Sequence, residues 1–243
     1  VLGAQRAAAW TEVARRIAHE IKNPLTPIKL SAERLEKKFG NDIKDPAFKE
    51  SVRVIVSQVD SLKNLVNEFN QFARLPKSVP VPGQLNKVIA DGLVLFRNSG
   101  RPDVVQFTAD ETLPIFYFDP DQMSRIINNL VDNALAAIVD TPGGKVVIRT
   151  QYDSVLKIAR IEVEDNGPGI PAALRERIFE PYMTTKVNGT GLGLAIVKRM
   201  VEDHQGFIRA FSDGASQTKF VIELPVVETP KGSSTSRLGE SYS

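Results

Sequence analysis

The chain has 243 residues, a formal net charge of +2, and 42% hydrophobic and 25% charged residues. These values are ordinary for a globular protein, and the length allows one large domain or two modest ones. A nearly neutral chain shows no electrostatic footprint of nucleic-acid binding. No apolar run approaches the roughly 20 residues of a membrane-spanning helix. The absence of cysteine excludes disulfides and thiolate metal sites.

Two long amphipathic segments occupy the first third of the chain. Apolar or small residues recur in steps of three and four within residues 6–39 and again within residues 46–69. This spacing predicts two helices, and Asp45 followed by Pro46 predicts where the second one begins. An antiparallel hairpin of such helices has little core of its own, so we expect two copies to form a homodimeric four-helix bundle. The expected seam comprises Trp10, Ala14, Ile17, Ile21, Leu25, Ile28, Ala32, Leu35 and Phe39, followed by Phe48, Val52, Ile55, Val59, Leu62, Val66 and Phe69.

The rest of the chain reads as a linker, a mixed α and β domain and a tail. Residues 76–84 contain three prolines and a glycine, which predicts a linker. We therefore expect a helical hairpin over residues 1–75, a second domain over residues 85–227 and a disordered tail over residues 228–243. Helices are expected at 85–96, 121–139, 171–178 and 192–203, and strands at 104–108, 115–118, 145–152, 156–165, 206–212 and 218–225.

Two glycine-rich stretches stand out in the second domain. EDNGPGI (164–170) follows a predicted strand, and NGTGLGLA (188–195) opens a predicted helix. Closely spaced glycines let backbone N–H groups approach a phosphate, and a helix N-terminus adds a favourable dipole. Neither stretch is a Walker A loop, and the GxGxG spacing without a preceding strand disfavours a dinucleotide site. Plain turns would explain one such loop more easily than two.

A pair of amides lies on the helix predicted over residues 121–139. Asn129 and Asn133 are four residues apart and share a face that differs from the apolar face of that helix. Two neutral amide oxygens suit a Mg²⁺ ion that keeps several waters and bridges phosphate oxygens. Two asparagines alone would more simply form a solvated polar face.

Taken in order, NNLVDNA, DNGPGI, IFEPYMTTK and GTGLGL resemble the N, G1, F and G2 boxes of the ATP-binding domain shared by sensor histidine kinases and the gyrase/Hsp90/MutL ATPases. The resemblance covers residues 85–225 and implies a Bergerat-type α/β sandwich that binds ATP under a mobile lid. It implies that Asn129 and Asn133 coordinate Mg²⁺ and that Asp165 accepts a hydrogen bond from the adenine amino group. The further nucleotide contacts that it implies are Gly167, Gly169, Lys186, Gly189, Gly191, Leu192 and Gly193.

The sequence departs from this pattern at Ala136, where many kinases of the group have a basic residue. Neutralisation of the phosphates then falls to Mg²⁺, the lid and Lys186.

His19 is one of two histidines in the chain. It lies two residues from Ile17 and from Ile21, about 200° around the helix from each, so we expect it to point away from the seam into solvent. A lone helical histidine is ordinarily packed or merely solvated. HEIKNPLTPI, however, resembles the phosphoacceptor box of the dimerising histidine-kinase domain. The resemblance makes His19 the phosphoacceptor, Glu20 its assisting carboxylate, and Asn23 the residue that orients water for dephosphorylation of the partner.

Pro24 follows this box, and Pro27 lies one turn further on. Proline removes one helical hydrogen bond and clashes with the carbonyl four residues earlier, here that of Glu20. We therefore expect a loosened or kinked helix, which we interpret as a hinge beside the nucleophile.

Together these features predict an ATP-dependent autokinase that transfers phosphate from His19 to the aspartate of a response regulator receiver domain. The segment 8–39 and FEPYMTTK are similar to the nitrogen-regulation branch, most of all to NtrY-type membrane sensors. This similarity implies an NtrX-like regulator and the cytoplasmic portion of an inner-membrane sensor, attached to the membrane only through segments upstream of this sequence. No direct contact with nucleic acid is expected. The alternatives are a phosphatase-dominant signalling scaffold with ATP as a conformational ligand, and a gyrase-like ATPase whose turnover is independent of His19.

Overall fold

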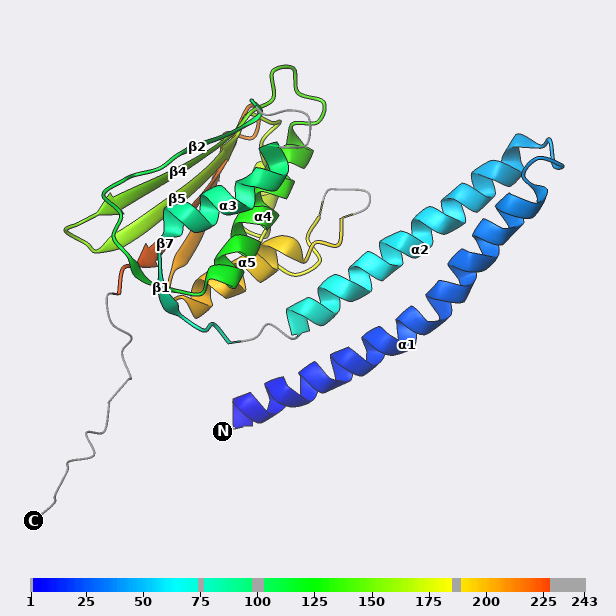
Figure 1. Ribbon diagram of the computed structural model, residues 1–243, viewed down its shortest axis with the longest axis horizontal. Coiled ribbons are helices and arrows are strands. Elements are labelled where there is room, and N and C mark those ends of the chain that lie inside the picture. Colours follow the sequence, from blue (N-terminus) through cyan, green and yellow to red (C-terminus); the bar gives the residue numbers. More distant parts are fainter. Residues whose placement is uncertain (1, 74–76, 98–102, 185–188, 228–243) are drawn as a thin grey trace, which may run out of the picture. The chain divides into compact units, whose positions relative to one another are not determined.

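The computed structural model describes residues 2–73, 77–97, 103–184 and 189–227. The side chains of residues 2–17 and of His19 lie outside this description. The chain divides into two compact units, Val1–Pro76 with Arg177–Ile196, and Lys77–Glu176 with Val197–Ser243. We refer to them as the helical unit and the α/β unit, and each is described by itself (Figure 1).

The helical unit is built on two antiparallel helices, α1 (Leu2–Phe39) and α2 (Pro46–Ala73). The predicted start of α2 is confirmed, because Asp45 Oδ1 accepts the Ala47 N–H at 2.9 Å and Pro46 is the first helical residue. The helix α1 continues through Pro24 and Pro27 without interruption. An ion pair joins the two helices, with Lys29 Nζ 2.7 Å from both carboxylate oxygens of Asp60.

The apolar seam of the hairpin is divided into a buried and an exposed half. Among the described side chains of each helix, the buried apolar positions are seven residues apart, whereas most of the apolar residues three positions further along are exposed. A period of seven places each set along one line of its helix. The buried stripe comprises Ala18, Leu25 and Ala32 on α1 with Val52, Val59 and Val66 on α2, and the exposed stripe comprises Ile21, Ile28, Leu35, Ile55 and Leu62.

The seam expected from sequence was therefore only partly right for a single chain. Ala18, which was not assigned to it, is 1% exposed, whereas Ile28, which was assigned to it, is 47% exposed. The cause is that two helices alone can cover only one side of a seam that is apolar on both sides.

The described residues of the α/β unit form two sheets and three helices, although the segment Arg177–Ile196 that includes the start of α5 groups with the helical unit. In chain order the elements are β1 (Val81–Gly83), α3 (Leu85–Arg97), β2 (Val105–Thr108), β3 (Phe116–Phe118), α4 (Pro120–Ala137), β4 (Val146–Asp153), β5 (Ile158–Asp165), α5 (Gly193–Asp203), β6 (Phe207–Ser212) and β7 (Thr218–Pro225).

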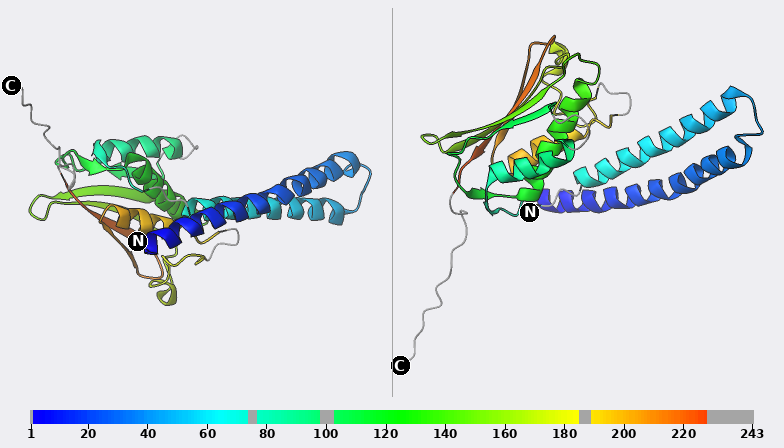
Figure 2. Two further views of the ribbon diagram at one scale, coloured as in Figure 1. Left: turned by 90° about the horizontal axis from the view of Figure 1, so that it is seen from below. Right: turned by 45° about the horizontal axis from the view of Figure 1, so that its top comes forward.

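The main sheet has the strand order β2-β4-β5-β7-β6, and its pairs are antiparallel except for the parallel pair β2 and β4. Burial alternates along β5 and β7, because one face of the sheet carries the core and the other carries polar side chains. The helices α3 and α4 cover the core face, with α4 over β4 and β5 (Figure 2). This arrangement confirms the expected α plus α/β fold class.

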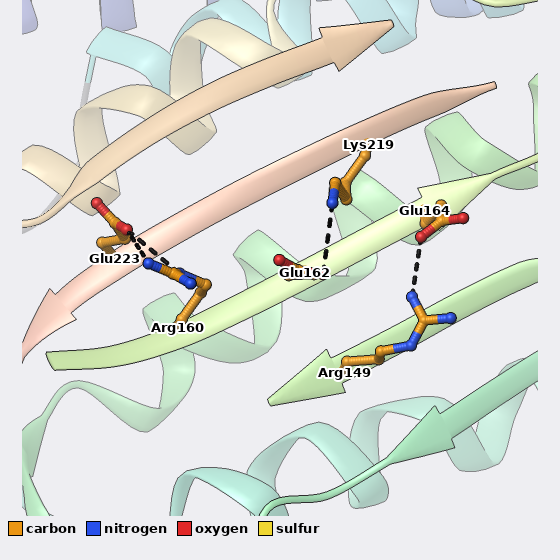
Figure 3. Close-up of polar contacts among 6 residues, drawn as sticks. All are labelled: Arg149, Arg160, Glu162, Glu164, Lys219 and Glu223. Carbon is orange, nitrogen blue, oxygen red and sulfur yellow. Dashed lines mark hydrogen bonds and ion pairs between the residues drawn. The ribbon is translucent and has the colours of Figure 1, made fainter. Parts of the chain in front are cut away.

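Charged side chains are paired across the polar face of the sheet (Figure 3). Arg149 lies 2.8 Å from Glu164, Arg160 lies 2.8 Å from Glu223, and Lys219 lies 3.8 Å from Glu162. Ion pairs that are this exposed contribute little stability each, typically below about 1 kcal/mol. Their effect is to keep this face hydrated, so that the sheet packs on helices from one side alone.

Two local expectations differ from the structure. The segment read as a linker contains β1, which pairs antiparallel with β3; a proline is tolerated because β1 is a short edge strand. The helix expected over residues 171–178 is only a 3₁₀ turn at Ala172–Leu174. No side chain caps its start, and the residues that follow are charged rather than apolar on one face.

No helix in the described part of the chain is both long and apolar enough to cross a bilayer.

Candidate functional site

The segment that resembles a phosphoacceptor box, residues 19–28, lies in the middle of α1. Glu20 and Asn23 are exposed, and the neighbouring Ala18 belongs to the buried stripe. The predicted direction of the His19 side chain lies outside the described residues. Because the helix is continuous here, Asn23 lies one turn beyond His19 on the same side of α1. The break expected at Pro24 is not seen as an interruption of the helix.

The two amides lie in the middle of α4, which is positioned by a strong N-cap. Asp119 Oδ1 accepts the N–H groups of Asp121 and Gln122, both at 3.0 Å, and Pro120 occupies the first turn. The apolar face of α4 is fully buried against the sheet, whereas Asn129 and Asn133 are half-buried. Packing against the sheet therefore fixes the rotation of α4 about its axis, so that the face with the two amides is not the face buried against the sheet.

The structure shows whether the side chains of Asn129 and Asn133 are suited to bind the Mg²⁺ ion that the sequence implies. The described part of the chain contains no cluster of three or more His, Asp or Glu side chains that could hold a metal. The Nδ2 of Asn129 donates to the Arg125 carbonyl at 2.9 Å, so its Oδ1 is the atom that could coordinate a cation. A set of amide oxygens fits a metal that takes its remaining ligands from phosphates and water. Ala136 is exposed, so no cationic side chain stands at that position.

Asp165 lies at the end of β5 and is 3% exposed. Burial raises the pKa of its carboxyl; the N–H of Gly167, which donates to Asp165 Oδ1 at 3.0 Å, lowers the pKa, and the charge of Glu164 raises it. The balance favours the neutral form more than in water. A buried carboxylate with one oxygen held by the backbone can present its other oxygen to a ligand with an N–H donor.

Gly167 brings the loop after β5 against the C-terminal end of α4. A Cβ at this position would lie 3.1 Å from both the Cβ and the carbonyl oxygen of Ala137, and 2.9 Å from Asp165 Oδ1. Only glycine allows this approach without moving α4 or the carboxylate. The structure thus brings Asp165 and Gly167 to the same helix that carries Asn129 and Asn133.

Gly169 fastens the same loop to the turn between β6 and β7. Its φ of +76° favours glycine, and a Cβ would lie 2.8 Å from Ser212 Oγ and 2.9 Å from the Ala215 nitrogen. The next residue, Ile170, donates its N–H to Ser212 Oγ at 2.8 Å and accepts from Arg175 Nε at 3.2 Å. The loop is therefore held on both sides.

The second glycine segment belongs to the part of the chain grouped with the helical unit. Gly191 has a φ of +71°, and a Cβ there would collide with the carbonyl carbon of Tyr182. Leu192 is fully buried, Gly193 begins α5, and Gly189 is half-buried. The F-box backbone thus passes directly against the G2 glycines. Lys186 lies outside the described residues.

Two polar residues near the loop escaped the sequence reasoning. Thr218, 5% exposed, lies opposite Asp165 in the register of β5 and β7. Ser212 holds Ile170 across 42 residues of sequence. Thr218 alternates with the apolar residues Phe220, Ile222 and Leu224 on one face of β7, which was a signal that could have been noticed, whereas nothing in the sequence marks Ser212.

Comparison with known proteins agrees with this geometry. Residues 9–77 match the His Kinase A (phospho-acceptor) domain, and residues 118–228 match the family of histidine kinase-, DNA gyrase B- and HSP90-like ATPases. Nitrogen regulation protein NtrY of Azorhizobium caulinodans is 42% identical over 213 residues, covering 86% of this chain and 28% of that protein. The sensory histidine kinase/phosphatase NtrB of Escherichia coli O157:H7 is 36% identical over 233 residues, covering 92% of this chain and 64% of that protein.

A solved structure resembles both halves of the chain. The crystal structure of histidine kinase ThkA in complex with response regulator protein TrrA has a TM-score of 0.64 at 27% identity, and the match covers 94% of this chain and 65% of that one. A phosphoacceptor domain and an ATPase domain thus follow one another in a single chain, as the motifs predicted. The chain belongs to the sensor histidine kinase family, on the branch that includes NtrY and NtrB. It spans less than a third of the length of the NtrY relative.

Proposed function

We propose that this chain is the catalytic core of an NtrY-like sensor kinase, which phosphorylates His19 from ATP and passes the phosphoryl group to the aspartate of a response regulator. The observation that carries the proposal is the succession of a phosphoacceptor match and an ATPase match in one chain. The domain boundaries we assign are residues 1–75 for the hairpin, 76–84 for the linker, 85–227 for the ATP-binding domain and 228–243 for the tail.

The nucleotide-binding roles that we propose are supported by the burial and contacts of Asp165, Gly167 and Gly169. Asp165 would accept a hydrogen bond from the adenine amino group. Its carboxylate is buried at the end of β5, and the Gly167 N–H donates to Oδ1 and leaves Oδ2 for the ligand. Asn129 and Asn133 would hold Mg²⁺, which when bound neutralises the developing charge on the phosphates. Gly167 and Gly169 would let the nucleotide close against the backbone. The remaining contacts at the phosphate end are assigned to Lys186, Gly189, Gly191, Leu192 and Gly193.

On α1, His19 would be the nucleophile, and Glu20 and Asn23 would assist the kinase and phosphatase reactions. A neutral imidazole nitrogen is nucleophilic near neutral pH, and the adjacent Glu20 would fix its tautomer or accept its other proton. Asn23, one turn further and exposed, would orient water toward a phosphorylated regulator. Pro24 would let the helix bend beside this pair.

Incubation with γ-labelled ATP tests the kinase proposal. The protein should acquire an acid-labile, alkali-stable label that is absent from His19→Gln. Asp165→Asn should also acquire less label at limiting ATP, because it binds nucleotide more weakly. A gyrase-like ATPase would instead show turnover that His19→Gln leaves unchanged, and undiminished label on His19→Gln would refute the proposal.

A phosphatase-dominant scaffold is the second candidate. It is favoured by the exposed Asn23, by the absence of a cation at Ala136, and by a relative whose name describes both kinase and phosphatase. Under this reading autophosphorylation is negligible, and Asn23→Ala abolishes dephosphorylation of a phosphorylated receiver domain. The ratio of the two activities in the unsubstituted protein decides between the candidates.

The partners follow from the exposed stripe and from the relatives. The stripe of Ile21, Ile28, Leu35, Ile55 and Leu62 would be covered by a second copy, giving a four-helix bundle. The regulator would be NtrX-like, as befits an NtrY-like kinase. The chain would be the cytoplasmic portion of an inner-membrane sensor, with its membrane segments upstream.

A further inference from the structure

One carboxylate in the α/β unit has two separate tasks. Asp119 is 8% exposed, and its Oδ1 caps α4 by accepting two backbone N–H groups. Its Oδ2 accepts the N–H of Val79 at 2.8 Å. Residues 77–79 are the first described residues after α2, so Asp119 ties the segment that enters the α/β unit to the N-terminus of α4.

The backbone of Asp119 is held by the second histidine of the chain. His204 Nδ1 lies 2.7 Å from the Met200 carbonyl, which can only accept, so this nitrogen carries the proton. The other ring nitrogen, Nε2, accepts the Asp119 N–H at 3.0 Å and lies 3.4 Å from Ser78 Oγ. The entering segment, the start of α4 and the C-terminal end of α5 therefore meet at one polar junction.

Residues 77–79, the entering segment, are fixed by this junction and not by the packing of apolar side chains. The side chain of Val79 is 68% exposed, and β1 begins only at Val81, so polar contacts, chiefly the hydrogen bond from the Val79 N–H to Asp119, hold this stretch of backbone. The buried carboxylate in turn depends on its partners, because an unpaired buried charge is strongly unfavourable.

We infer that Asp119 and His204 are positioning residues that make the connector from the phosphoacceptor hairpin and the amide-bearing helix α4 move as one piece. The inference rests on the proposed kinase function and deepens it. A displacement of α2 that moves residues 77–79 would be transmitted to α4 through two contacts: the hydrogen bond from the Val79 N–H to Asp119, and the contact of Ser78 with His204, which binds the Asp119 N–H. A connector without these contacts would absorb the displacement. The presentation of ATP to His19 would then depend on the junction, whereas the affinity for ATP would not.

Asp119→Asn separates the two tasks. An amide keeps one oxygen, which can still cap α4, but it places an NH₂ donor opposite the Val79 N–H and loses that bond. Asp121→Asn is the matched control, since it makes the same substitution two residues away at an exposed position in the first turn of α4. Val79→Pro removes the donor from the other side and leaves Asp119 and its cap intact.

Three measurements on the whole chain test the junction. Hydrogen exchange of the Val79 amide should accelerate by at least about tenfold in Asp119→Asn, in line with the loss of a hydrogen bond to a charged acceptor. The rate of His19 phosphorylation at saturating ATP should fall by roughly tenfold in Asp119→Asn and in Val79→Pro, as expected for a misplaced reactive group. The dissociation constant of a fluorescent ADP analogue should stay within about twofold, a range too small to account for the lost rate. Asp121→Asn should match the unsubstituted protein in all three.

Equal phosphorylation rates in Asp119→Asn and Asp121→Asn would overturn the inference, and so would equal exchange of the Val79 amide. A loss of nucleotide affinity that accounts for the whole loss of rate would also overturn it, because Asp119 would then act only through the folding of α4. If Asp119→Asn does not fold, Val79→Pro gives the same decision. A chain that never acquires label contradicts the proposed kinase function instead, and the amide exchange of Val79 still reports on the junction.

Discussion

Gly169 offers a sharp test of how the nucleotide loop is built, because the chain contains a matched control. Gly169 and Gly143 have similar backbone angles, with φ of +76° and +67°. A Cβ on Gly169 would meet Ser212 Oγ at 2.8 Å and two backbone atoms of the β6–β7 turn at 2.9 and 3.0 Å, whereas a Cβ on Gly143 would meet nothing within 4 Å. Alanine at either site therefore has the same backbone strain, but only Gly169→Ala adds crowding.

The expected losses of stability and of ATP affinity follow from the backbone strain and the crowding. Forcing an L-residue into the left-handed region costs roughly 1–2 kcal/mol, which is the whole effect expected for Gly143→Ala. Overpacking adds roughly 1–3 kcal/mol, so Gly169→Ala should destabilise the α/β unit by about 2–5 kcal/mol in total. If the loop relieves the crowding by moving, ATP binding must restore its position, and the dissociation constant should rise by roughly 5- to 150-fold.

Urea unfolding followed by circular dichroism measures the first quantity, and calorimetric titration with ATP measures the second. Gly143→Ala should bind ATP within about twofold of the unsubstituted protein, since its strain is local. Equal losses of stability in the two variants, or unchanged ATP affinity in Gly169→Ala, would refute the view that the β6–β7 turn holds the nucleotide loop.

Three further outcomes are expected. Ile28→Glu should shift sedimentation from dimer toward monomer, whereas Val54→Glu, equally exposed at 47% but outside the exposed stripe, should not. Lys29→Met should destabilise the hairpin only slightly at low salt, because its ion pair with Asp60 is partly exposed, and the difference should vanish near about 1 M salt. Burial raises the pKa of Asp165, so the α/β unit should lose stability as pH rises from the ordinary carboxyl value of 3.8 through that raised pKa. Asp165→Asn should remove this loss in thermal melts while weakening ATP binding roughly 10- to 150-fold.

Much of the fold could be predicted because the long elements carry strong local signals. The 3.6-residue period over α1, α2 and α4, and the alternation over β5 and β7, give the right element types with small errors at the ends. The strand β1 within the segment 76–84 was missed because proline and glycine mark both linkers and short edge strands, and only pairing with β3 distinguishes them. A segment of mixed charge after Pro171 likewise lacked the apolar face that a stable helix needs.

In the α/β unit, the sequence pointed to the glycines, the two amides and the carboxylate of the candidate site, but not to the polar residues that support them. Glycines in a fixed spacing report a backbone requirement that is local and therefore visible in the sequence. Ser212, Thr218 and His204 act through contacts with residues far away in the chain, so their role could not be read from their neighbours. The division of the hairpin seam was also hidden, because hydrophobicity does not reveal which neighbour covers a residue.

The short side chains of the buried stripe have a consequence for how folding depends on protein concentration. Apart from Leu25, the buried stripe consists of alanine and valine, which remove little apolar area from water, so one hairpin gains little from closing. Folding of the hairpin is then linked to association, and its melting point should rise with protein concentration while that of the α/β unit stays constant. Trp10, the one tryptophan of the chain, lies in α1 and reports this transition by fluorescence. If two copies of this chain associate as proposed, a dilute sample would contain a smaller fraction of folded hairpin than a concentrated one.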